Sequence, residues 1–96
     1  MRILAAAEKD LEDGYRFYER QSPGLGSYFL DSLYSDIDSL TYFAGIHRLV
    51  FGYHRLLSKR FPFAVYYQIA EDIVVVKAVL DCRRNPSWIR ERLMKG

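Results

Sequence analysis

Apolar residues recur at helical spacing through the first half of the chain. Between residues 4 and 21 they stand three or four positions apart, and acidic side chains such as Asp10 lie largely off this stripe. A second stripe follows after the segment SPGLGS at 22–27, which contains a proline and two glycines. The stripes consist of Leu4, Ala7, Leu11, Tyr15 and Tyr18, and of Phe29, Leu30, Leu33, Ile37, Leu40 and Phe43 or Ala44. Because the connection is short, we expect an antiparallel helical hairpin whose second helix ends at Gly45.

The pattern changes from residue 47 onward. Residues 47–60 mix strand-forming residues with cations, which is typical of a strand or an extended chain. Residues 61–69 alternate as a half-buried strand does, and Pro62 belongs at its start because it lacks an N–H. Residues 73–80 are nearly all apolar or β-branched, as in a central strand, and the polar turn at 70–72 predicts a β-hairpin. The sequence therefore predicts an α+β fold, in which the helical hairpin packs on one face of a small antiparallel sheet of three to four strands.

Length and composition fit one domain spanning residues 1–96, with half of its residues hydrophobic. A single cysteine, Cys82, cannot form an intramolecular disulfide, which fits a reducing compartment. Lys77 interrupts the longest apolar run, so no transmembrane helix is expected, and the apolar stretch near the N-terminus is too short for a signal peptide. These features predict a soluble cytoplasmic protein.

The net charge of +2 hides an uneven distribution. Residues 1–46 carry four basic and eight acidic side chains, and residues 47–96 carry ten basic and four acidic ones, so the halves have charges of −4 and +6. Such polarity favours a basic surface that binds nucleic acid or an acidic protein. An acidic helical layer beside a basic sheet, with no ligand, explains it equally well.

Cations from two separate segments are the main candidates for a functional site. Arg55, Lys59 and Arg60 come from one expected strand, and Arg83 and Arg84 follow the end of another. If those strands are neighbours, the guanidinium groups converge into a surface for phosphate or for an acidic partner. The alternative is a sheet face whose long cationic side chains are merely solvated.

Arg48, Trp88 and Arg90 extend this candidate partner surface. Trp88 forms a small apolar patch with Ile89 and Leu93 among C-terminal cations. We expect a C-terminal turn that tucks Trp88 against the sheet, while the flanking cations remain available to a partner.

The remaining residues with reactive side chains have structural explanations. His54 is adjacent to Arg55, so in a regular strand its side chain points to the opposite face, and packing is the better interpretation for both His54 and His47. Tyr66 and Tyr67 alternate along a strand and are expected in the core. Cys82 is expected to be a small buried hydrophobe. No metal site and no cofactor are predicted.

Three segments of the chain resemble the RelE/ParE toxin superfamily, especially chains called plasmid-stabilisation proteins. They are YRFYERQSPGLGSYFLDSL, HRLLSKRFPFAVYYQI and VVVKAVLDCRRNPSWIRERL, in family order over nearly the whole chain. The most specific blocks are Arg60–Phe63 followed by Tyr66 and Tyr67, and the Arg-Arg-Asn-Pro block after the last strand. Members usually open with a β-strand, for which only Met1–Leu4 remain here, so that strand is either very short or was lost to a misplaced start codon.

The resemblance implies a type II toxin that an adjacent gene's antitoxin binds and neutralises, the antitoxin wrapping the toxin with an extended or helical segment. ParE-like members inhibit DNA gyrase by binding it. RelE-like members cleave mRNA on the ribosome through attack by the RNA 2′-hydroxyl, for which the candidates here are Arg55, Lys59, Arg60, Arg83 and Arg84. The middle strand, FPFAVYY, lacks the basic residue that cleaving members tend to have, which favours the ParE-like activity. An inactive relative that only binds a partner is a third hypothesis, and the sequence leaves the target and the oligomeric state open.

Overall fold

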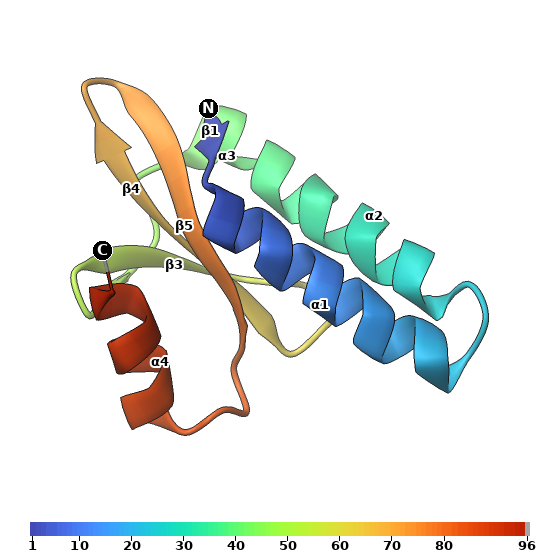
Figure 1. Ribbon diagram of the computed structural model, residues 1–96. Helices are drawn as coiled ribbons and strands as arrows, with labels where there is room; N and C mark the ends of the chain where they lie inside the picture. The colour runs from blue at the N-terminus through green and yellow to red at the C-terminus, as the bar shows by residue number, and fades with distance from the viewer. Residues whose placement is uncertain (96) are drawn as a thin grey trace.

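Helices and strands form separate layers in the computed structural model, which describes residues 1–95 (Figure 1). The elements, in chain order, are β1 (Arg2–Ile3), α1 (Ala5–Gln21), α2 (Leu25–Asp38), α3 (Leu40–Phe43), β2 (Leu49–Val50), β3 (Tyr53–Leu57), β4 (Phe63–Ala70), β5 (Ile73–Asp81) and α4 (Pro86–Met94). Helices α1 and α2 lie side by side along the sheet, and α4 stands apart from them. The predicted α+β class and the N-terminal helical hairpin are confirmed.

The helical hairpin has a tighter connection than its sequence predicted, since α1 and α2 leave only residues 22–24 between them. The Glu19 carboxylate on α1 accepts hydrogen bonds from the backbone N–H of Gly24, at 3.1 Å, and of Gly26, at 3.0 Å. The Gly24 amide lies at the N-cap of α2 and the Gly26 amide in its first turn, and neither has a partner within the helix. Glu19 therefore caps α2 from the neighbouring helix.

The second helical stripe is divided at Ser39, where α2 ends and α3 begins. The Ser39 hydroxyl donates to the Asp36 carbonyl at 2.6 Å, which competes with the regular ladder of the helix. Gly45 follows α3 with a φ of 96°, in the left-handed region that favours glycine. The prediction that the second helix itself runs to Gly45 was wrong, because α2 ends at Asp38 and the separate short helix α3 ends at Phe43.

The sheet contains five strands in the order β1-β5-β4-β3-β2, so the predicted count of three to four was too low. The expectation of a purely antiparallel sheet was also wrong, because β1 pairs parallel to β5. The two-residue strands explain both errors: Arg2–Ile3 and Leu49–Val50 are too short for any periodicity. The very short first strand that the family resemblance implied is present.

Two-residue turns join β2 to β3 and β4 to β5, whereas residues 58–62 connect β3 to β4. Phe51 and Gly52, between β2 and β3, have φ values of 52° and 85°, and Glu71 and Asp72, between β4 and β5, have 51° and 64°. Positive φ at both turn residues matches the twist of paired strands. The predicted β4–β5 hairpin is confirmed.

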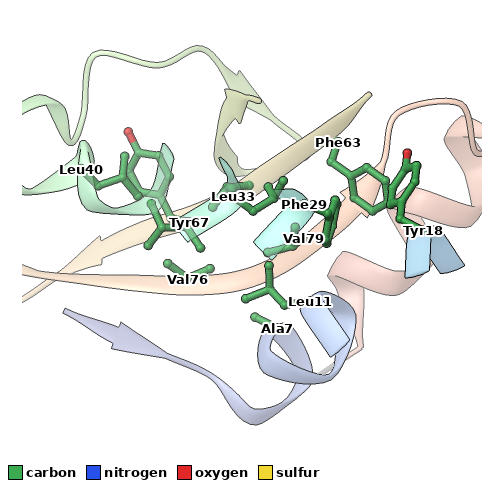
Figure 2. Close-up of a cluster of buried hydrophobic side chains, with 12 residues drawn as sticks. Ala7, Leu11, Tyr18, Phe29, Leu33, Leu40, Phe63, Tyr67, Val76 and Val79 are labelled. Atoms are coloured by element: carbon green, nitrogen blue, oxygen red, sulfur yellow. The ribbon is translucent and has the colours of Figure 1, made fainter. Parts of the chain in front are cut away.

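One face of the sheet forms the main hydrophobic core with α1 and α2 (Figure 2). Leu11 from α1 and Phe29 from α2 meet Val76 and Val79 of β5 there. Aromatic rings fill one end of this core, where the Phe29 ring centroid lies 4.9 Å from that of Phe63. The aromatic block after Arg60 therefore has a packing role.

The opposite face of the sheet is covered by α4, a helix that the sequence analysis expected only as a turn. Ile89 and Leu93 of α4 are buried against Tyr66 and its neighbours in a second, smaller core. The Asn85 side chain accepts a hydrogen bond from the Ser87 N–H at 2.9 Å and begins the helix, with proline at its first position. Among the described residues, no helix is long and apolar enough to cross a membrane.

Candidate functional site

Arg83 lies just beyond β5 and is paired with a carboxylate of its own chain. Its Nε and one terminal nitrogen donate to the two carboxylate oxygens of Asp81 at 2.9 and 2.7 Å. The Arg83 hydrogen bonds are the main reason that the pKa of Asp81 lies below its usual value. Arg83 is still largely exposed, but its charge is already partly neutralised.

Arg84 points to a different neighbour, the indole of Trp88 on α4. The guanidinium carbon lies 4.1 Å from the ring centroid, which is a cation–π contact. Trp88 is 36% exposed, so the expectation that it tucks against the sheet was wrong. Ile89 and Leu93 hold α4 on the sheet instead, and Trp88 stays at the surface beneath Arg84.

Arg55 lies on β3 opposite Tyr66, on the sheet face that α4 covers. Its Nε is buried and has no hydrogen-bond partner in the described structure. Cys82 is exposed, so the prediction of a buried cysteine was wrong. Local burial nevertheless raises the pKa of its thiol, while the charges of Arg55 and Arg83 lower it. Arg55 stands opposite Tyr66 on the α4 side of the sheet, whereas Arg83 binds Asp81, which stands opposite Phe63 on the main-core side. The structure therefore does not join these two predicted site residues in one cluster.

The other predicted cations lie at the surface on separate segments. Lys59 and Arg60 are exposed in the connection between β3 and β4, rather than within a strand as expected. Arg48 is exposed just before β2, and its carbonyl accepts the Arg55 amide at 2.9 Å. Arg90 is exposed on α4.

Both histidines lie on the other side of the sheet, toward the helical hairpin. The His54 ring stacks on that of Tyr67, with centroids 5.1 Å apart, and its Nδ1 is 2.7 Å from the His47 carbonyl oxygen. His47 Nδ1 forms a hydrogen bond with the Tyr67 hydroxyl, which also accepts the Gly45 amide at 2.9 Å. Tyr67 is fully buried, as predicted, and the packing interpretation of both histidines fits these contacts.

The structure also contains a groove that the sequence analysis missed. It has a volume of about 670 Å³ and lies between α1, the end of β5 and α4. Across its floor, Asp10 Oδ2 accepts the Val79 amide at 3.0 Å and an Arg92 nitrogen at 2.8 Å. Asp10 stands three residues after Ala7 and one before Leu11, so its carboxylate lies at the margin of the apolar stripe. That position was the one signal in the sequence that Asp10 contacts the sheet at this groove.

No group of three or more histidine, cysteine or acidic side chains in residues 1–95 could hold a metal ion. The cations, the aromatic rings and the groove described above instead provide surfaces that suit the binding of anions or of polypeptide.

Comparison with known proteins identifies the family. Residues 1–86 match the family described as the ParE toxin of the type II toxin–antitoxin system parDE. No curated protein matches the sequence. A solved structure described as the chromosomal ParDE TA system from P. aeruginosa matches with a TM-score of 0.75 and 19% identity, over 81% of this chain and 89% of that chain. That likeness establishes a common fold.

The matched family agrees with the resemblance that the sequence blocks indicated, and it spans every element except α4, which begins at Pro86. The chain belongs to the ParE toxin family of type II toxin–antitoxin systems.

Proposed function

We propose that this toxin arrests growth by binding DNA gyrase, and that its antitoxin neutralises it by direct binding. The target would then be cytoplasmic. The exposed cations Arg48, Arg60 and Arg90 would contribute contacts to these partners, since charged side chains at the rim of an interface speed association and select partners. The family match supports the toxin role, and the site geometry supports binding over catalysis.

The observation that carries this proposal is the placement of the two histidines. Cleavage of RNA by its 2′-hydroxyl needs one group to remove a proton and another to return one. His47 and His54 are on the helical side of the sheet, packed around Tyr67, whereas Arg55 is on the side that α4 covers. Neither imidazole can serve a phosphate held by Arg55.

The titratable groups near Arg55 and Arg83 are poor bases. Burial raises the pKa values of the Tyr66 hydroxyl and the Cys82 thiol, so both stay protonated at neutral pH. The pKa of the Asp81 carboxyl is lowered because Arg83 binds it, so the Asp81 carboxylate is a weak base. A surface with cations and no effective base fits a binding function.

The RelE-like alternative has one observation in its favour. Arg55 keeps a buried Nε without a partner, as a site awaiting an anion would. If phosphate binds there for catalysis, Arg55 would stabilise the charge that develops on it.

The discriminating experiment is to express the toxin alone and measure growth, DNA-damage signalling and the 5′ ends of cellular RNA. We expect growth arrest and DNA-damage signalling with no new RNA ends. New RNA ends that disappear in Arg55→Ala or Arg83→Ala would overturn the proposal in favour of a ribonuclease. Unaffected growth with abundant folded protein would instead indicate an inactive partner-binding relative.

A further inference from the structure

Two arginines stand opposite one another on the α4 side of the sheet. The register of β2 and β3 places Arg48 opposite Arg55, and the Arg48 carbonyl accepts the Arg55 amide at 2.9 Å. Val50 of β2 packs against the second core, so Arg48, two residues earlier, faces the same side of the sheet as Arg55. Like charges at opposite positions destabilise a pair of strands, and an anion between them removes this repulsion.

A third arginine joins them from the flank of α4. Trp88 and Arg92 line the groove toward α1, at the β5 edge. An α-helix turns by about 100° per residue, so Arg90, two residues from each of them, points to the opposite flank. The strand order places β3 and β2 on that flank, and the Tyr53 hydroxyl of β3 donates to the Leu93 carbonyl of α4 at 3.3 Å. Arg48, Arg55 and Arg90 therefore form one basic face.

The charge of this basic face is not compensated within residues 1–95. None of its three arginines forms an ion pair there, and the buried Nε of Arg55 has no hydrogen-bond partner. Glu91 follows Arg90 on α4 and borders the same shallow pocket, but the two side chains are not paired in this part of the chain. Three guanidinium groups against one carboxylate leave a surplus of positive charge, which favours an anionic ligand.

The tyrosines beside these arginines narrow the kind of ligand. Single-stranded RNA is bound by stacking its bases on exposed aromatic rings, and a protein partner is anchored by aromatic side chains that it can bury. Tyr66 is 2% exposed, and the Tyr53 hydroxyl is already bonded to α4. Neither ring is free for those uses. Guanidinium groups without an aromatic anchor suit the phosphate backbone of a duplex.

We propose that the basic face binds the phosphate backbone of duplex DNA. Arg48 and Arg90 bind phosphates from the two sides of the face, and Arg55 between them adds its positive charge. The toxin thereby contacts the DNA that gyrase carries, a use that rests on the proposed function. Phosphate contacts carry no sequence information, so the toxin binds duplexes of any sequence.

The test is the fluorescence anisotropy of a short labelled DNA duplex titrated with purified toxin, without gyrase, at several salt concentrations. Contacts with three phosphates predict that the logarithm of the binding constant falls with the logarithm of the salt concentration with a slope of about −2.7. Arg48→Gln combined with Arg90→Gln should reduce this slope by about 1.8 and weaken binding about tenfold or more. Both arginines are exposed, so the fold should tolerate the changes.

A matched pair of substitutions supplies the control. Arg16→Gln combined with Arg20→Gln removes the same charge from exposed positions of α1 and should retain DNA binding. Absence of DNA binding by the folded toxin, or equal loss in the two double variants, would overturn the proposal. Tighter binding of single-stranded RNA of the same length would reassign the face to RNA, and equally effective displacement of the DNA by an oligoglutamate peptide would reassign it to an acidic protein. The supercoiling activity of gyrase is measured separately, so a failure here is distinguishable from a failure of the proposed function.

Discussion

At Asp10 a single carboxylate oxygen accepts both the Val79 amide and Arg92, and so connects α1, β5 and α4. Burial is the largest influence on this carboxyl and raises its pKa, while the Val79 amide and Arg92 lower it. The side chains of Arg92 and Asp10 are 22% and 14% exposed, so removal of one partner leaves the charge of the other uncompensated in a poorly solvated position.

The substitution Asp10→Ala should therefore lower the free energy of unfolding by about 2–4 kcal/mol, since Arg92 loses its carboxylate partner and the Val79 amide loses its acceptor. Urea denaturation measures this change. Asp13→Ala is the matched control on the same helix: its contact with Lys9 is exposed, and its loss should cost no more than about 0.5 kcal/mol. Equal losses in the two variants would contradict this role of Asp10.

His47 provides a pH dependence of stability. The Tyr67 hydroxyl accepts the Gly45 amide and keeps its own proton to donate, and Nδ1 of a neutral His47 imidazole is the acceptor bonded to it. Burial, followed by the charge of His54, lowers the pKa of His47 from 6.5. Between this lowered pKa and 6.5, the unfolded chain therefore binds more protons than the folded protein does. The free energy of unfolding consequently falls as the pH drops below 6.5.

The corresponding measurement is the urea midpoint at about pH 7.5 and about pH 5.5 for the parent and for His47→Gln. We expect the parent to lose more stability on acidification than the variant. Identical pH dependence would mean that another group carries it.

At the scale of elements, the close approach of α1 and α2 depends on Gly26. A Cβ atom there would lie 2.7 Å from the Tyr15 carbonyl oxygen and 2.9 Å from the Glu19 Cβ. A backbone oxygen inside a helix cannot move aside cheaply, so the two helices must separate.

Gly26→Ala should consequently destabilise the protein by about 1–3 kcal/mol, although alanine favours a helix more than glycine does. Thermal unfolding provides the measurement. Ser27→Ala, at the next and exposed position of α2, should leave the melting temperature nearly unchanged. A Gly26→Ala variant as stable as the parent would show that the helices do not need this contact.

The predictability of each element followed its length. The period of the apolar stripe predicted α1 almost to the residue, and the alternation in β4 predicted its faces. The strands β1 and β2 have two residues each, and their existence depends on partners distant in sequence. The C-terminal segment combines Pro86 with an irregular apolar pattern, so its helix emerged only from packing on the sheet.

At the scale of the whole molecule, the unequal charges of the two halves have more than one use. Asp10 and Arg92 form an ion pair between the acidic hairpin and the basic second half, so part of the asymmetry stabilises the fold. The sequence singled out Arg55 and Arg83, which lie on opposite sides of the sheet. It did not reveal that Asp81 binds Arg83, which depends on the conformation of the turn after β5. Nor did it reveal that three distant segments enclose a groove, which depends on how α4 and α1 flank β5.

We propose that this ParE-family toxin acts by binding gyrase. The most direct measurement is the supercoiling of relaxed plasmid DNA by purified gyrase in the presence of increasing amounts of purified toxin. We expect inhibition that depends on toxin concentration, that is retained in Asp13→Ala and that is relieved by an excess of antitoxin. Full supercoiling at saturating concentrations of folded toxin would contradict it.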